Sequence, residues 1–265
     1  NRLWQHHFGR GLVASTNNFG VQGELPTHPE LLDYLAGRLV AEGWSLKALH
    51  RLMLLSETYQ LSSQPVAASL AADPLNKHWH YRPPQRLDAE VIRDSLLVLA
   101  RQLEPAVGGE GVQPYISPNA SANKPDFLPK SGPLDGGRRR SIYIKVRSNY
   151  LTSMLAVFDF PSPGASVGVR VETSSPLQAL SLLNNPFVQE QAAHWARQSA
   201  DEPDESARAT LMFREAFCRS PKARELAVMQ ELLANRRAAQ PDSAGAEWAE
   251  LAHVLVCSQE MQFAY

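Results

Sequence analysis

Three carboxylates stand close together in the segment RLDAEVIRDS, where Asp88, Glu90 and Asp94 alternate with arginines. Two carboxylates beside one cleft can act as general acid and base, and can hydrolyse a glycosidic bond. Together with His50, these residues are the candidate catalytic groups. The alternative is a helix start, on which acidic residues favour the positive end of the helix dipole and pair with neighbouring arginines. The segment leaves both interpretations open.

The histidines do not form a recognisable metal motif. A catalytic metal ion needs about three protein ligands and an open position. His6 and His7 are adjacent, so on a helix their side chains diverge by roughly 100° and do not readily share one ion. A site that joined His7, His28 and His50 would require convergence in the fold that their spacing does not predict. We therefore expect no metal site and no cofactor.

A basic run follows the middle of the chain and forms the candidate ligand-binding set. Its members are Arg138, Arg139, Arg140, Lys145 and Arg147, with Tyr143 among them. Arginine grips carboxylate and phosphate groups through two parallel hydrogen bonds, which suits an acidic or sulfated polysaccharide. The alternative is a solvated edge strand whose charges discourage aggregation.

Aromatic residues border the long middle loop and could stack on sugar rings, although packing in the core is at least as good an explanation for them. They are Trp79, Tyr81, Tyr115, Phe127 and Tyr143. The sequence contains no G-x-S-x-G nucleophile motif and no phosphate-binding glycine loop. The motifs therefore favour binding over a familiar class of catalysis.

Composition narrows the class of protein. The chain has 265 residues, of which 44% are hydrophobic, and 26 basic residues balance 27 acidic ones. Nucleic acid is not an expected partner, because no excess of positive charge exists to collect phosphates. No apolar run is long enough for a transmembrane segment. Cys218 and Cys257 lie in apolar helical contexts, so we expect two buried free thiols, with a disulfide between them as the alternative.

The hydrophobic pattern predicts a mainly α, multi-helix fold with a small two- or three-stranded β element and a long middle loop. Residues 1–105 form an N-terminal helical half, and residues 106–140 a loop rich in Gly and Pro. Residues 141–265 contain the short β element and the C-terminal helical half. We expect one domain, and a fragment of a longer protein, since the chain begins in the middle of a pattern.

The β element rests on one alternating segment. Ile142, Ile144 and Val146 point to one side, which predicts a half-buried strand. Such a strand needs a partner for its backbone groups. Residues 166–174 are the first candidate for that partner, and residues 111–117 are the second.

Six stretches together resemble one family in the same order. They are NRLWQHHFGRGLV, HPELLDYLA, GWSLKALHRLMLLSETYQLSS, QRLDAEVIRDSLL, RRRSIYIKVRSN and SPLQALSLLNNPFV. The chain resembles the planctomycete-type domain of unknown function that forms the C-terminal part of large exported proteins. Those proteins often carry cytochrome-c-like domains upstream. The resemblance implies an exported location, in the periplasm or cell envelope, and upstream domains of the same polypeptide as partners.

Three hypotheses of function follow. The first is a binding or assembly module for a polysaccharide or a partner protein. The second is a carbohydrate-active hydrolase that uses Asp88, Glu90 or Asp94. The third is a docking surface for a cytochrome-c-type redox domain.

Overall fold

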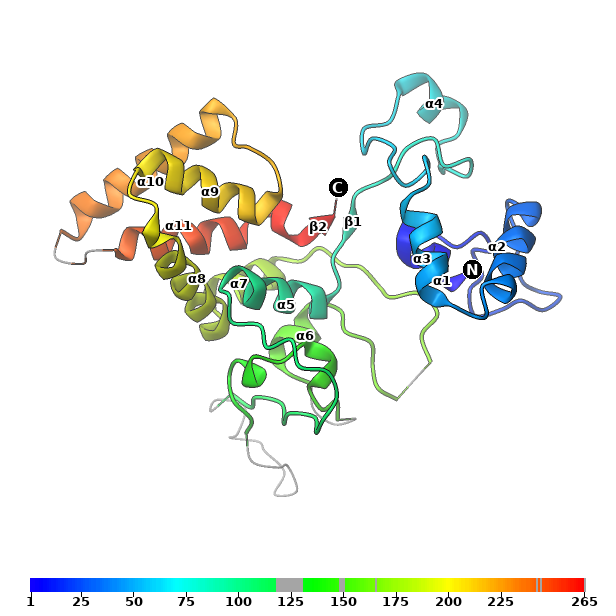
Figure 1. The fold of residues 1–265 in the computed structure, drawn as a ribbon, viewed down its shortest axis with the longest axis horizontal. Coiled ribbons are helices and arrows are strands. Elements are labelled where there is room, and N and C mark those ends of the chain that lie inside the picture. The colour runs from blue at the N-terminus through cyan, green and yellow to red at the C-terminus, as the bar shows by residue number, and fades with distance from the viewer. Residues whose placement is uncertain (118–130, 148–150, 165, 242, 244, 265) are drawn as a thin grey trace. The chain divides into compact units, whose positions relative to one another are not determined.

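The computed structural model describes residues 1–117, 131–147, 151–164, 166–241, 243 and 245–264. The protein is mainly α-helical, which confirms the predicted fold class (Figure 1). The chain divides into two compact units. Unit 1 consists of Asn1–Arg86, Val167–Val169 and Phe263–Tyr265, and unit 2 of Leu87–Ser166 and Arg170–Gln262.

Unit 1 is built from short helices around a small aromatic core. The helices are α1 (Arg2–Phe8), α2 (Pro29–Ala41), α3 (Leu46–Leu54) and α4 (Ala67–Ala72). Trp4 and Phe8 lie four residues apart on one face of α1, and their rings stack with centroids 4.0 Å apart. The other members of this core are Leu12, Leu35, Leu49, Met53 and Trp79.

Two distant pieces of chain complete unit 1. The side-chain amide of Gln5 donates a hydrogen bond to the carbonyl oxygen of Gly168 at 3.3 Å. Strand β1 (Gln85–Arg86) pairs antiparallel with strand β2 (Phe263–Ala264). Unit 1 is therefore discontinuous in sequence. Its two-stranded sheet pairs β1, which precedes unit 2 in the chain, with β2, which follows unit 2.

The β element lies elsewhere than the sequence predicts. In place of the predicted strand, Ser141–Tyr143 forms the 3₁₀ helix η3, and Ile142 is 81% exposed while Ile144 is buried. The side chain of Asp94 binds both the amide and the hydroxyl of Ser141, and this draws the chain into a turn. The prediction of a strand here is wrong because the alternation carried no information about that anchor.

The two predicted partners of that strand differ in outcome. One parallel bridge joins Val112 to Ile144, so the segment 111–117 does lie against it. The described residues 166–174 contain no strand. Two backbone hydrogen bonds accompany this bridge, from the Val112 amide to the Tyr143 carbonyl oxygen and from the Lys145 amide to the Val112 carbonyl oxygen.

Unit 2 contains the longer helices. They are α5 (Ala89–Leu99), α6 (Ser153–Val157), α7 (Pro176–Asn184), α8 (Pro186–Gln198), α9 (Glu205–Phe217), α10 (Ala223–Ala239) and α11 (Ala246–Cys257). Short 3₁₀ helices connect them: η2 (Gly136–Arg138), η3, η4 (Ser199–Asp201) and η5 (Glu260–Gln262). Pro176 and Pro186 occupy first-turn positions, where a missing N–H group costs no hydrogen bond.

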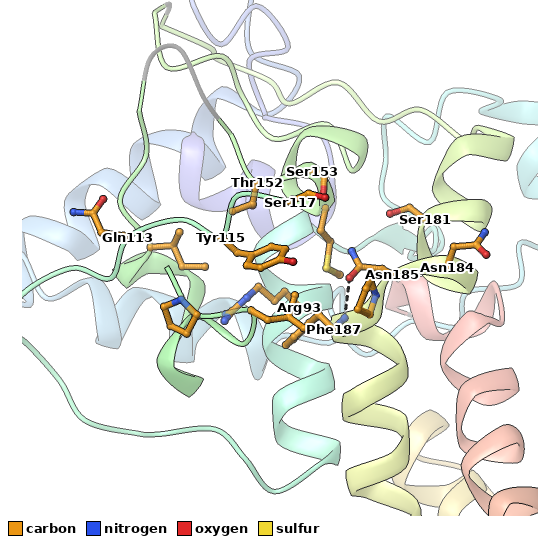
Figure 2. Close-up of a pocket in the computed structure, with 16 residues that line it drawn as sticks. Arg93, Gln113, Tyr115, Ser117, Thr152, Ser153, Ser181, Asn184, Asn185 and Phe187 are labelled. Carbon is orange, nitrogen blue, oxygen red and sulfur yellow. Dashed lines mark hydrogen bonds between the residues drawn. The ribbon is translucent and has the colours of Figure 1, made fainter. Parts of the chain in front are cut away.

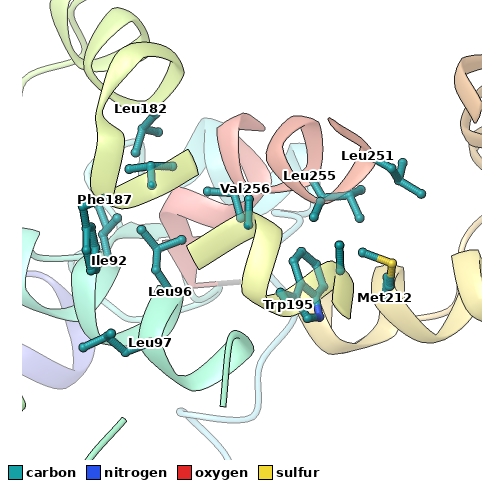
Figure 3. Close-up of a cluster of buried hydrophobic side chains, with 14 of the residues drawn as sticks. Ile92, Leu96, Leu97, Leu182, Phe187, Trp195, Met212, Leu251, Leu255 and Val256 are labelled. Carbon is teal, nitrogen blue, oxygen red and sulfur yellow. The ribbon is translucent and has the colours of Figure 1, made fainter. Parts of the chain in front are cut away.

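The core of unit 2 centres on α8 and α11, which pack against each other (Figure 3). Trp195 on α8 is 1% exposed, and its indole N–H donates to Glu215 at 2.7 Å. Burial of such side chains contributes about 25 cal/mol for each Å² of apolar surface removed from water. Figure 3 labels further members of this core: Ile92, Leu96, Leu97, Leu182, Phe187, Met212, Leu251, Leu255 and Val256.

The described part of the middle segment contains only short 3₁₀ and bridge structure, and residues 118–130 of the predicted loop lie outside the described residues. Both cysteines are free thiols, but neither is fully buried as expected: Cys257 is partly buried, and Cys218, which follows the last turn of α9, is exposed. Across the described chain, no helix combines the length and the apolar character that a bilayer crossing requires.

Candidate ligand-binding site

Unit 2 contains a cavity of about 280 Å³ where α5, the start of α6 and the junction of α7 and α8 meet (Figure 2). Hydrogen-bonding side chains form much of its lining: Arg93, Gln113, Tyr115, Ser117, Thr152, Ser153, Ser181, Asn184 and Asn185. Apolar side chains complete it: Pro133, Leu134, Ile144, Met154, Pro186 and Phe187. Such a mixture of apolar surface and a few oriented polar groups is typical of small-molecule sites.

Arg93 holds one wall of the cavity in place. Its guanidinium group is 5% exposed and donates to Asp94 at 3.0 Å, to the carbonyl oxygen of Arg139 at 3.0 Å and to Ser141 at 3.1 Å. It also donates to the carbonyl oxygen of Asp135. Burial lowers the pKa of Arg93, and the neighbouring Asp94 carboxylate opposes that shift. The pair fixes the wall and leaves little net charge there.

Gly136 is the residue that lets this wall form. Its backbone has φ +63°, a left-handed conformation that residues with a Cβ atom rarely adopt. A Cβ atom at this position would collide with Nη2 of Arg93. The left-handed φ therefore favours glycine at this position, and a Cβ atom here would also force the Arg93 guanidinium to shift.

Four hydroxyl groups line the cavity without a hydrogen-bond partner among the described residues: Ser117, Thr152, Ser153 and Ser181. A hydroxyl can donate one hydrogen bond and accept two, as a sugar hydroxyl can. The ring of Tyr115 lies in the same cavity (Figure 2). A ring and several available hydroxyls suit a ligand with its own hydroxyl groups and an apolar face.

Two adjacent asparagines stand at the junction of α7 and α8. Asn185 is the N-cap of α8, and its Oδ1 atom accepts from the amide of Phe187 at 3.0 Å. The Nδ2 atom of Asn184 donates to the carbonyl oxygen of Leu180 at 2.9 Å. Each side chain therefore keeps one half of its amide available: an acceptor oxygen on Asn184 and a donor nitrogen on Asn185.

The predicted carboxylates lie in unit 2 but do not line the cavity. Arg170 donates to both oxygens of Glu90, at 2.7 and 2.8 Å, and lies 3.4 Å from Asp88. The hydrogen bond to Glu90 raises the pKa of Arg170, which keeps this guanidinium charged. Asp94 is bound by Arg93 and Ser141. All three carboxylates are thus held in ion pairs with arginines.

His50, the fourth predicted catalytic residue, belongs to unit 1. Its Nδ1 atom lies 2.7 Å from Nε2 of His7, and the ring of Tyr59 lies against His7. His28 contacts the ring of His78 instead. Within the described ranges, no three His, Cys, Asp or Glu side chains converge as a group that could hold a metal ion.

The basic run has two kinds of members. Arg139 donates to the carbonyl oxygens of Glu110, Ala106 and Gly108 and stacks on Tyr143 at 3.8 Å. The Tyr143 hydroxyl accepts from the Gly108 amide. These two residues hold the chain between 106 and 110 in its turn.

Of the other members of the basic run, two have side-chain partners and two are exposed. Lys145 pairs with Glu110 at 2.8 Å, and Arg147 donates to the side chain of Gln113 at 3.0 Å. Arg147 thereby orients a residue that lines the cavity. Arg138 and Arg140 are exposed. Of the aromatic residues considered from sequence, Tyr115 lines the cavity, whereas Phe127 lies outside the described residues.

Sequence reasoning did not identify Arg93 or the two asparagines as site residues. The pattern Asn-Asn-Pro between two apolar segments is a helix N-cap signal, and it could have marked the α7–α8 junction. Arg93 carried no such signal, because its partners other than the adjacent Asp94 lie more than 40 residues away in the chain.

Fold and cavity together define a mainly helical, two-unit protein with a polar pocket in its larger unit. The chain belongs to the PSD1 family, a protein family of unknown function (DUF1553), whose model matches residues 1–233. This confirms the resemblance found in the sequence. No curated protein and no solved structure matches the chain.

Proposed function

We propose that this protein is a binding module of the cell envelope that receives a polysaccharide in the cavity of unit 2. The observation that carries the proposal is the set of hydroxyls on Ser117, Thr152, Ser153 and Ser181, which have no hydrogen-bond partner within the described parts of the chain and lie in the same cavity as the ring of Tyr115. A sugar ring presents hydroxyls at its edge and C–H groups on its faces, so one ligand satisfies both kinds of surface.

The surroundings of the carboxylates favour binding over hydrolysis. A glycosidase places two carboxyl groups on either side of the bond that it cleaves. Among the described residues that line this cavity, the one charged side chain is Arg93. Asp88 and Glu90 pair with Arg170, and Asp94 pairs with Arg93. Because none of the three carboxylates lines the cavity, they are poorly placed to transfer protons to a ligand in it.

The exposed arginines account for the acidic character that we propose for the polysaccharide. Arg138 and Arg140 follow the wall residue Gly136 and extend into solvent. Carboxylate or sulfate groups along a bound chain would pair with them, which adds attraction that weakens as salt is raised.

Binding is tested with the full chain and a panel of acidic and neutral polysaccharides, by isothermal titration calorimetry. We expect binding that Tyr115→Ala weakens about fivefold, since a lost ring contact costs about 1 kcal/mol. Tyr34→Ala is the matched control, because Tyr34 is an exposed tyrosine of unit 1. Absence of binding to every polysaccharide, or equal effects of the two variants, would refute the proposal.

A further inference from the structure

Helix α7 presents a row of three leucines to solvent. Leu177 is 60% exposed, Leu180 is 53% and Leu183 is 51%. They follow one another at intervals of three residues, so they lie in one row along the helix. The opposite face of α7 packs into the core of unit 2, where Leu182 is 1% exposed. A surface helix usually keeps its apolar side chains on the core face, so a second apolar face indicates a contact with something else.

The leucine row borders the cavity of unit 2. Ser181 and Asn184, which also belong to α7, line the same side of that cavity (Figure 2). Leu177 precedes Ser181 by four residues, and Leu180 precedes Asn184 by four residues. Side chains at this spacing are neighbours on the surface of a helix. The polar lining of the cavity and the leucine row are therefore two parts of one continuous surface.

The chemistry of the leucine row selects the kind of group that can cover it. None of the residues from Pro176 to Asn184 is acidic or basic, so α7 offers no charge for a polar partner to pair with. A hydroxyl or a charged group pressed against the leucines would lose its hydrogen bonds to water without a replacement. A hydrocarbon chain in the same place gains free energy as each methylene group leaves water. The row therefore suits an alkyl or acyl chain, beside a cavity that suits a sugar.

We infer that the ligand of this site is a saccharide with an attached hydrocarbon chain. Its sugar occupies the cavity, and its chain lies along Leu177, Leu180 and Leu183. The inference rests on the proposed function, because it names the class of saccharide that the cavity receives. The sugar bound in the cavity is then the one next to the lipid, since the leucines begin within about one helical turn of Ser181 and Asn184.

The test compares two ligands that differ only in the hydrocarbon chain. Methyl β-glucoside and n-octyl β-glucoside, the latter below its critical micelle concentration, are titrated against the full chain by ligand-detected NMR. We expect the octyl compound to bind at least tenfold more tightly, because each methylene group removed from water strengthens binding about fourfold. Leu180→Gln should lower this ratio at least threefold and leave the affinity for methyl β-glucoside unaltered.

Leu211→Gln is the matched control, since Leu211 is an exposed leucine of α9 that lies outside the described lining of the cavity. Thermal unfolding of both variants verifies that they fold. An octyl chain on a tetraethylene glycol head shows whether the chain binds without a sugar, and we expect this compound to bind at least tenfold more weakly than octyl β-glucoside.

Three results would overturn the inference and assign the leucines to another partner. They are an octyl β-glucoside affinity no greater than that of the methyl compound, equal effects of the two variants, and equal affinity for the glycol compound. If polysaccharides still bind in that case, the proposed function stands without the inference. If no saccharide of any kind binds, both are overturned.

Discussion

The Nε2 atom of His7 lies 2.7 Å from the Nδ1 atom of His50, so the two imidazole rings share one hydrogen bond between α1 and α3. One ring must donate and the other accept, which requires at least one neutral ring. Burial lowers the pKa of His7, and the nearby His50, His6 and Arg82 lower it further. Full protonation of the pair would place two cations in contact.

The first prediction is a loss of stability in unit 1 in mild acid. The pKa of His7 is lower in the folded state than in the unfolded state. The contribution of His7 to the free energy of unfolding is therefore complete above the unfolded-state pKa of about 6.5. It is lost as the pH falls from that value through the lowered pKa of the folded state. Hydrogen exchange of the full chain should show weaker protection of α1 and α3 at pH 5 than at pH 7.5. Peptides from α8 and α11 serve as internal references.

A variant shows whether the histidine pair causes this change. His7→Gln removes the titrating ring and should reduce the pH dependence of protection in α1 and α3. His194→Gln, on α8, removes a histidine outside unit 1 and should leave that dependence unaltered. An unchanged dependence in His7→Gln would assign the effect to other groups.

The second prediction concerns the two functions of Asn185, which caps α8 and lines the cavity. Asn185→Ala should lower the free energy of unfolding by about 1 kcal/mol, because an N-cap is lost. It should also weaken binding of the polysaccharide, because Asn185 lines the cavity. Asp204→Ala removes the N-cap of α9, where Asp204 accepts from Ala207 at 2.7 Å, and should cost similar stability without affecting binding. Equal binding losses would mean that stability alone is responsible.

The third prediction concerns the buried guanidinium. Arg93→Met should lower the free energy of unfolding by about 3 kcal/mol. The reason is that Asp94, whose side chain is only 24% exposed, would lose the arginine that pairs with it. Denaturation in urea measures the change. Arg138→Met, at an exposed position of the same segment, should alter stability by less than about 0.5 kcal/mol. Similar values for the two variants would contradict the structural role of Arg93.

The fourth prediction separates binding from hydrolysis. Incubation of the protein with a polysaccharide that it binds should release no new reducing ends. Glu90→Gln should bind that polysaccharide with unchanged affinity, because Glu90 pairs with Arg170 outside the cavity lining. Release of reducing ends by the original protein, lost in Glu90→Gln, would establish the hydrolase hypothesis instead.

The helices could be predicted from sequence because their signals are local. The apolar residues of α5 recur at helical spacing, and Pro176 and Pro186 mark the starts of α7 and α8. The strand predicted at 142–146 does not form, because the structure of this segment depends on a residue that is distant in sequence. Its alternation is also local, but the turn that replaces it depends on Asp94, which lies 47 residues from Ser141.

The candidate site was only partly predictable. Tyr115 was recognised as a residue that could stack on a sugar, and it does line the cavity. The asparagines and hydroxyls were missed because isolated serine, threonine and asparagine residues are common in every loop and helix end. In the fold, each of these side chains has an atom without a hydrogen-bond partner among the described residues. A sequence does not show which polar atoms are left without a partner.

The pairing of β1 with β2 sets an order of events during synthesis. Translation proceeds at about 5–20 residues per second, so Phe263 leaves the ribosome roughly ten to thirty seconds after Arg86, its partner in the sheet. Throughout that interval β1 has exposed edge groups. Unit 2 also needs α11, which ends only at Cys257, to complete its core with α8, so both units are expected to be completed late in synthesis.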